Sequence, residues 1–226
     1  GYALATSFDF PPEVAAGIIL IGCSPSGLAS NVMAYIAKAN VALSLTITSC
    51  ATLLAPVLTP LLMKVLGGEF IQVDFFKMMV EILKIIILPI GVGLLINKIF
   101  RNQAQFLNKY MPLLSMAGIA LIICIITAAG RESLLKVGGI LVICMLLHNL
   151  SGYLLGYWSA RLLKLPEQDC RTVAIEVGLQ NGGLASGIAL QMGKVATVGL
   201  APALFGPIMN VTGSLLASWW GKKPVK

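Results

Sequence analysis

Long apolar runs alternate with short polar segments along most of the chain. Crossing a bilayer as a helix takes about 20 apolar residues. Five runs are long enough to do so: 41–66, 75–96, 111–130, 134–163 and 195–220. Two further runs, 11–38 and 169–192, are apolar but are interrupted by polar and glycine-rich patches. No stretch alternates apolar and polar residues strictly, so strands are not expected. The pattern predicts an all-α polytopic membrane protein.

The composition agrees with this class. Hydrophobic residues make up 58% of the chain and charged residues 11%, with a mean hydropathy of +0.91. A soluble domain carries roughly 25% charged residues. The sequence also has no Ser/His/Asp set, phosphate-binding loop or HExxH motif. We therefore expect a membrane protein that is not an enzyme, with the lipid bilayer as its surroundings.

The net charge of +7 is explained by orientation rather than by nucleic-acid binding. If the spans alternate across the membrane, basic residues gather on one side, which the positive-inside rule assigns to the cytoplasm. This group contains Lys38, Lys98, Arg101, Lys109, Arg161, Lys164, Arg171, Lys222, Lys223 and Lys226. The opposite group is smaller and contains Lys64, Lys77, Arg131, Lys136 and Lys194. The C-terminus is therefore predicted to be cytoplasmic.

A short segment occurs twice. "GLASNVMAYIAK" (27–38) and "GLASGIALQMGK" (183–194) share Gly, Leu, Ala, Ser and the closing Lys, and each follows a glycine-containing break. Five crossings separate the copies, so they are expected to run in opposite directions, as in the inverted repeats of secondary transporters. The second copy follows three full spans, whereas a short segment precedes the first. We therefore expect about three helices of the same protein to be missing before Gly1.

The two breaks, "GCSPSGLASN" and "VGLQNGG", are candidates for a binding site. Unwound backbone at membrane depth must be buried in protein or line a wet cavity, because lipid cannot satisfy its N–H and C=O groups. Broken helices also direct their termini at ions and substrates. The alternative is a pair of packing kinks without a ligand.

Glu176 is the most informative residue beside these breaks. A charge at the bilayer centre costs about 3 kcal/mol on insertion scales, so it needs a partner. If the helix continues past the break, Gln180 lies on the same face. One carboxylate with amide and backbone oxygens suits a hard monovalent cation such as Na⁺. The alternative is a carboxylate near the interface, paired with Arg171. Further oxygen donors near the first break are Ser30, Asn31, Ser44 and Thr48.

His148 is a lone histidine within a predicted span. A polar side chain in such a place is more often an interhelical hydrogen-bond partner than a proton carrier.

Four segments together resemble the bile acid:sodium symporter family, especially its bacterial members. They are "GCSPSGLASNVMAYIAKANVALSLTITS", "LLHNLSGYLLG", "EVGLQNGGLAS" and "NVTGSLLASWW", and they extend the resemblance over essentially the whole chain. The resemblance implies ten helices in two inverted five-helix repeats, with a panel domain and a core domain that holds two crossing, broken helices. About seven of the ten helices would be present here. Residues 1–66 would end the first repeat, 67–130 would supply panel helices and 131–226 core helices.

The resemblance also implies two sodium ions. The first would bind Ser30, Asn31, Ser44, Thr48 and Glu176. The second would share Glu176 and add Gln180 with the backbone carbonyls of Val177 and Leu179. A family glutamine from the third helix would complete the second site, and that position is not in this chain.

An organic anion, either a bile acid or a smaller carboxylate such as pantoate, is the substrate that the resemblance implies. It would bind beside the crossing, at Asn181, Gly27, Gly183 and Ser26, where positive helix ends suit a carboxylate. The expected activity is sodium-coupled symport by alternating access in a bacterial inner membrane. One alternative is an arsenite-type efflux carrier, which has a cysteine where this chain has Ser26. The other is a membrane sensor or assembly subunit that does not transport.

Overall fold

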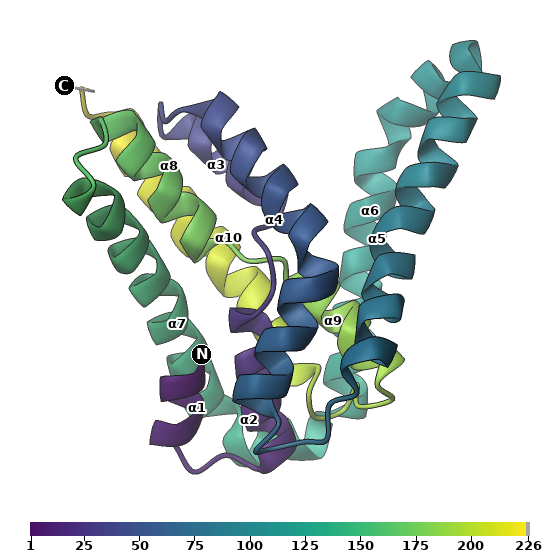
Figure 1. Cartoon of the computed structure of the whole chain (residues 1–226), viewed down its shortest axis with the longest axis vertical. Helices are drawn as coiled ribbons and strands as arrows, with labels where there is room; N and C mark the ends of the chain where they lie inside the picture. Colours follow the sequence, from purple (N-terminus) through teal and green to yellow (C-terminus); the bar gives the residue numbers. More distant parts are fainter. Residues whose placement is uncertain (225–226) are drawn as a thin grey trace.

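The computed structural model describes residues 1–224, and the side chains of all of these except 101–109 and 112. Figure 1 shows the helices in their chain order. They are α1 (Tyr2–Ser7), α2 (Pro12–Gly22), α3 (Ala29–Ile36), α4 (Val41–Leu62) with the π-helical turn η1 (Met63–Gly67), α5 (Phe75–Ile99), α6 (Arg101–Ala129), α7 (Arg131–Leu162), α8 (Glu167–Gly178), α9 (Gly182–Gln191) and α10 (Leu200–Gly221).

The all-α membrane class is confirmed. Within the described residues, four helices are long and apolar enough to span a membrane: α4 with η1, α5, α7 and α10. Two shorter apolar helical stretches, Pro12–Gly22 and Leu113–Ala129, lie beside them. Large apolar side chains such as Leu88 and Leu155 are exposed on these helices, which suits contact with lipid tails.

Three of the predicted spans differ from the helices at their first residues. The span expected at 134–163 differs least, because its helix begins at Arg131. The span expected at 111–130 belongs to a helix that already begins at Arg101, because the polar segment before the apolar run is also helical. The span expected at 195–220 begins at Leu200 instead. Residues 195–199 form turns that fold back on Lys194, whose carbonyl accepts hydrogen bonds from Thr197 N and Gly199 N.

Each of the two interrupted runs forms a broken helix. The first consists of α2 and α3, and the second of α8 and α9, with unwound residues between the halves. In Figure 1 the chain rises from α2 to α3 but descends from α8 to α9. The two broken helices therefore run in opposite directions, as the repeated segment predicted.

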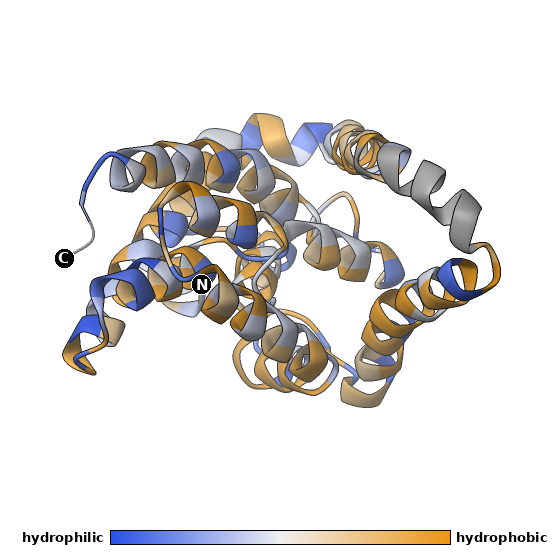
Figure 2. Cartoon of the chain, turned by 90° about the horizontal axis from the view of Figure 1, so that it is seen from above, coloured by the Kyte–Doolittle hydropathy of each residue, from blue (hydrophilic) through white to orange (hydrophobic). Residues whose placement is uncertain are grey.

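The helices divide into two groups that diverge toward one end. The pair α5 and α6 leans away from the remaining helices, and Figures 1 and 2 show it on one side of the molecule. The groups meet at the lower end of Figure 1, where α5 packs against α4 and α9. The described part of this pair carries mostly hydrophobic residues (Figure 2).

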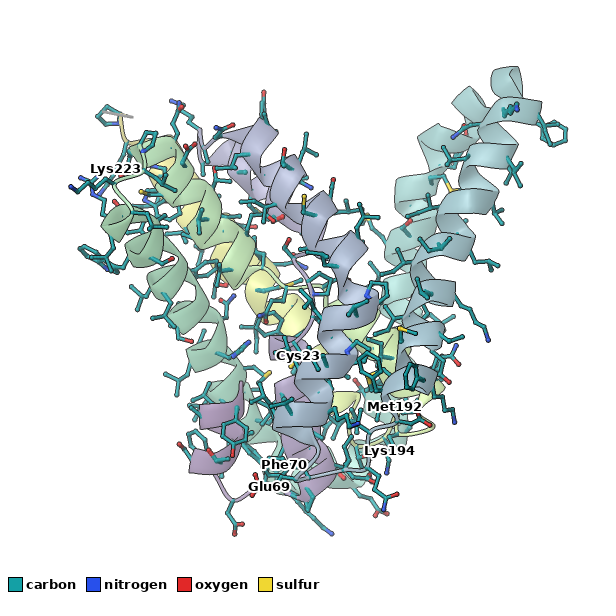
Figure 3. The ribbon with its side chains drawn as sticks, viewed as in Figure 1. Cys23, Glu69, Phe70, Met192, Lys194 and Lys223 are labelled. Carbon is teal, nitrogen blue, oxygen red and sulfur yellow. The ribbon has the colours of Figure 1, made fainter. Side chains whose placement is uncertain are left out.

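The two predicted groups of basic residues lie at opposite ends of the helices. The α3–α4, α5–α6 and α7–α8 connections and the C-terminus are at the upper end of Figure 1. Figure 3 labels Lys223 at that end and Lys194 near the other. Lys226 lies outside the described residues, and the side chains of Arg101 and Lys109 are likewise not described.

Small residues bring α8 close to α7. A Cβ atom added at Gly152 would lie 3.0 Å from the Val177 carbonyl oxygen, and one at Gly156 would lie 2.8 Å from that of Val173. Such glycine contacts let helix backbones approach each other closely in a membrane. The contact fixes the end of α8, which carries Glu176, against the long helix α7.

Candidate functional site

The unwound segments of the two broken helices cross and pair with each other. Gly27 N donates to Leu179 O at 3.0 Å, and Asn181 N donates to Pro25 O at 2.7 Å. These bonds form an isolated antiparallel bridge between Ser26 and Gln180. Backbone groups that lipid could not satisfy are thus satisfied by the other break. The crossing that was predicted from the resemblance is present.

Two half-helices begin directly beside this crossing. The Asn181 side chain caps α9, because its Oδ1 accepts from Leu184 N at 2.9 Å. At the other break, Ser30 Oγ donates to Gly27 O at 2.8 Å in the first turn of α3. The positive ends of both half-helices therefore lie near the middle of the molecule.

A cluster of oxygen atoms surrounds Glu176, which is 3% exposed. Ser44 Oγ donates to Glu176 Oε1 at 2.5 Å, and Thr48 Oγ1 donates to Glu176 Oε2 at 2.8 Å. Ser44 and Thr48 are one turn apart on α4, so both hydroxyls reach the same carboxylate from α8. Each carboxylate oxygen is thereby held by a different hydroxyl.

The remaining members of the cluster come from α3. Asn31 Oδ1 lies 2.8 Å from Ser44 Oγ and 3.4 Å from Thr48 Oγ1. Ser30 Oγ lies 3.3 Å from Thr48 Oγ1. All five residues predicted for the first sodium ion are therefore brought together from three helices. We refer to Ser30, Asn31, Ser44, Thr48 and Glu176 as the oxygen cluster.

Arg171 does not neutralise Glu176. Its Nε donates to Glu167 Oε1 at 2.9 Å, and its Nη1 donates to the backbone oxygens of Ala37 and Trp220. Glu167 is the one direct ion-pair partner of Arg171 among the described side chains. The alternative of an interfacial Glu176–Arg171 pair is therefore wrong.

The residues predicted for a second sodium ion are not arranged as the sequence suggested. Because α8 ends at Gly178, Gln180 lies in the unwound segment and does not share a helical face with Glu176. Gln180 Oε1 is instead 2.8 Å from His148 Nε2, so His148 is a hydrogen-bond partner that joins α7 to the second break. Leu179 O accepts from Gly27 N, and Val177 O faces Gly152. Gln180 and Glu176 share no hydrogen bond among those of the described residues.

A cavity of about 330 Å³ lies beside the crossing. Its walls come from the start of α3, the middle of α6, the start of α9 and α10. Three of the predicted substrate residues, Gly27, Asn181 and Gly183, line it. Ser26 lies behind them at the crossing, where its Oγ is buried without a hydrogen-bond partner among the described residues.

Other residues of the cavity were not singled out from the sequence. Ile119, Ile122 and Ile123 of α6 form an apolar wall, and Asn210 of α10 adds an exposed amide. A signal for Asn210 existed, since it is an amide inside an apolar run. The isoleucines carry no such signal, because α6 is apolar on every face over this stretch.

Membrane-spanning helices with two broken helices that cross around a buried carboxylate are the architecture of secondary transport proteins. The chain belongs to the sodium bile acid symporter family, whose sequence profile matches residues 1–137. This confirms the resemblance, and it confirms a transport-protein class rather than an enzyme class.

Curated relatives agree with this family. The chain is 41% identical over 226 residues to the uncharacterized sodium-dependent transporter YocS of Bacillus subtilis (strain 168). This alignment covers all of this chain and 70% of the relative. It is 33% identical over 218 residues to the probable sodium/metabolite cotransporter BASS1, chloroplastic, of Arabidopsis thaliana, covering 96% of this chain and 54% of that protein. It is also 33% identical over 220 residues to the corresponding BASS2 protein of Oryza sativa subsp. japonica, covering 97% and 52%. The chain thus spans about half the length of these plant relatives.

Proposed function

We propose that the protein carries out sodium-coupled symport of an organic anion by alternating access. The observation that carries this proposal is the oxygen cluster, in which hydroxyls of Ser44 and Thr48 hold both oxygens of Glu176. The names of the relatives, a sodium-dependent transporter and sodium/metabolite cotransporters, support the same coupling ion and a metabolite as cargo.

The chemistry of the oxygen cluster fits a sodium ion. It offers one carboxylate, one amide oxygen and three hydroxyls, with the negative charge of a single side chain. A buried carboxylate without a cationic partner costs about 3 kcal/mol or more in a bilayer. One monovalent cation neutralises that charge, and the hydroxyl oxygens can then turn their lone pairs toward the ion. Multiple carboxylates, which calcium prefers, are not part of the cluster.

A second sodium ion is part of the proposal. It would share Glu176 and use Gln180 with the carbonyl oxygens of Val177 and Leu179. Gln180 already lies beside the crossing, where His148 holds its side-chain oxygen. Binding there would therefore compete with the His148 hydrogen bond.

The cavity beside the crossing suits a carboxylate with an apolar body. The amides of Asn181 and Asn210 and the N-termini of α3 and α9 favour the anionic end. The isoleucines of α6 favour an apolar remainder. Ligand pockets range from about 300 to 1,000 Å³. A volume of about 330 Å³ is at the lower end, which favours a small carboxylate such as pantoate over a bile acid.

The divergence of the two helix groups supports alternating access. Residues 67–130 would act as the panel and the remaining helices as the core, in a fold of two inverted repeats. The groups open toward the end that carries more basic residues, which the positive-inside rule assigns to the cytoplasm. The structure would then be inward-open, with a cytoplasmic C-terminus, in a bacterial inner membrane.

Calorimetric binding of pantoate and of a bile acid, in sodium and in choline buffer, tests this function. We expect binding that requires sodium and that is lost in Glu176→Gln. Glu132→Gln, an exposed carboxylate at the start of α7, is the matched control. Equal binding in sodium and choline would contradict the symport proposal. Uptake into vesicles separates a transporter from a sensor, because a sensor binds without accumulating its ligand.

A further inference from the structure

Two adjoining hollows lie at the basic end of the molecule, away from the crossing. One of about 390 Å³ lies between the last turns of α7 and α10 and the first turns of α8. The other, of about 310 Å³, shares Glu167, Arg171 and Lys223 with it and adds Arg161 and Pro224. We call the two together the terminal pocket. Figure 3 shows Lys223 at this end.

We propose that the terminal pocket binds an anionic phospholipid, with the phosphate between Arg161 and Lys223 and an acyl chain along α7 and α10. This inference rests on the proposed cytoplasmic orientation of this end but not on the transported substrate or ion, because no residue of the oxygen cluster or the substrate cavity takes part.

Arg171, the buried cation of the pocket, has a structural role. Arg171 is 2% exposed, and its donors are used by Glu167 and by the carbonyls of Ala37, Trp220 and Pro224 at the ends of α3 and α10. The other oxygen of Glu167 accepts from Tyr157 Oη at 2.8 Å. The Arg171–Glu167 pair therefore shapes the pocket, and Arg171 balances the charge of Glu167.

Two exposed cations remain at the rim. Arg161 and Lys223 make no direct ion pair among the described side chains. The Lys223 ammonium lies 3.5 Å from the centre of the Trp219 ring, which holds it over the hollow. Three cations against one carboxylate give the terminal pocket a net positive charge, and the exposed Arg161 and Lys223 are the two that an anion can reach.

The walls indicate that the anion belongs to a lipid. Leu154 and Leu216 line the larger hollow, together with Tyr153 and Trp219. Trp and Tyr gather at membrane interfaces, and basic pockets between spanning helices on the cytoplasmic side bind anionic headgroups. A soluble phosphate would gain nothing from the apolar walls. The net positive charge of the terminal pocket disfavours the ammonium group of an ethanolamine headgroup.

The three tryptophans provide a direct readout. Trp158, Trp219 and Trp220 all lie at this end, so quenching of intrinsic fluorescence reports on lipid here. The purified protein is placed in phosphatidylethanolamine nanodiscs, and chain-brominated phosphatidylglycerol or phosphatidylethanolamine is titrated in. We expect phosphatidylglycerol to quench at lower concentration. In the double variant Arg161→Gln/Lys223→Gln its affinity should fall roughly 30-fold, since each basic residue near the surface strengthens binding about fivefold.

The control is Lys64→Gln/Lys136→Gln, which removes two exposed lysines at the opposite end and should leave the quenching unchanged. Equal quenching by the two lipids, or equal loss in both double variants, would overturn the proposal. Displacement of the lipid by millimolar inorganic phosphate would show that the pocket binds free phosphate rather than a lipid, and it would contradict the proposal. Arg171 is left intact, because its loss would remove the bonds to the ends of α3 and α10.

Discussion

Ser44 Oγ lies 2.5 Å from Glu176 Oε1, and this contact joins α4, which follows the first broken helix, to α8, the first half of the second broken helix. Thr48, one turn further along α4, bonds the other carboxylate oxygen. The two broken helices and α4 are thus connected through one carboxylate. A cation bound there would therefore contact residues of both broken helices.

Removal of one hydroxyl should weaken sodium binding. We expect Thr48→Ala to lower sodium affinity roughly tenfold, equivalent to about 1.4 kcal/mol, because one ligand oxygen is lost. Thr48→Ser keeps the oxygen and should bind as before. The measurement is the rise in melting temperature with sodium concentration, which follows the affinity of the folded state.

Thr46→Ala is the matched control for this experiment. Thr46 is on the same helix, but it is exposed and bonds the carbonyl of Ala42 at 2.8 Å. If Thr46→Ala and Thr48→Ala shift the sodium response equally, the oxygen cluster is not the sodium site.

A second prediction concerns the close packing of α2. A Cβ atom at Gly17 would lie 2.3 Å from the backbone oxygen of Val198, so Gly17→Ala forces the backbone to move. Such overpacking typically costs about 1–3 kcal/mol. We expect a lower melting temperature for this variant.

Gly139→Ala is the corresponding control in α7, because an added Cβ there meets nothing within 4 Å. It should be neutral or stabilising by up to about 1 kcal/mol, the difference in helix propensity between Gly and Ala. A melting temperature of Gly17→Ala equal to that of the unchanged protein would show that α2 and the turn after Lys194 are not in tight contact.

A third prediction concerns the anchor of the second break. Asn149 is fully buried; its Nδ2 donates to Gly178 O at 2.8 Å, and its Oδ1 accepts from Thr212 Oγ1 at 2.5 Å. Asn149→Ala removes the side-chain donor to the Gly178 carbonyl, whereas the Thr212 hydroxyl keeps its bond to the carbonyl of Ile208. An unsatisfied buried group costs about 1–3 kcal/mol, so we expect clear loss of thermal stability. Ser214→Ala, which removes an exposed hydroxyl bonded within α10, should cost little.

Hydropathy was sufficient to predict the spans, because a bilayer imposes length and apolarity on each helix separately. It was also sufficient to place the two breaks, since glycine, proline and amides interrupt the apolar runs. It did not predict that α6 begins at Arg101, because helix formation does not stop where the apolar face stops. Nor did it predict the turns at 195–199, where an apolar segment folds back on Lys194.

The oxygen cluster could be assembled only partly from sequence. The spacing of Ser44 and Thr48 predicted that they share one helix face. Their contact with Glu176 joins residues 128 or more positions apart, so it could be predicted only from the family resemblance. The place of Gln180 depended on where α8 ends. That end is set by pairing with the first break, so no local pattern around Gln180 could reveal its contact with His148.

Acid should weaken one contact between α2 and the α9–α10 connection. Hydrogen bonds from Lys194, and then from Thr197, hold the pKa of the Glu13 carboxyl below its ordinary value of 4.5. Since the folded pKa is lowered, the stabilisation is complete above the ordinary value and is lost as the pH falls through the folded pKa. We expect Glu13→Gln to remove this part of the pH dependence of the melting temperature. Glu132→Gln should keep it, and identical acid profiles of both variants would contradict the assignment.

The last prediction tests the position of the substrate site with a variant that should leave sodium binding unchanged. An added Cβ at Gly183 would have Asn181 Oδ1 as its nearest neighbour, at 3.5 Å, so a larger side chain can enter the cavity without a clash at its base. We expect Gly183→Leu to lower organic-anion affinity by roughly tenfold or more, because the side chain occupies ligand volume. Sodium-dependent stabilisation should persist, since Gly183 is not part of the oxygen cluster. Gly91→Leu, at a position in α5 open to its surroundings, should leave both properties unchanged. Calorimetry of the anion beside melting curves in sodium separates the two effects, and retained anion affinity in Gly183→Leu would exclude this cavity as the substrate site.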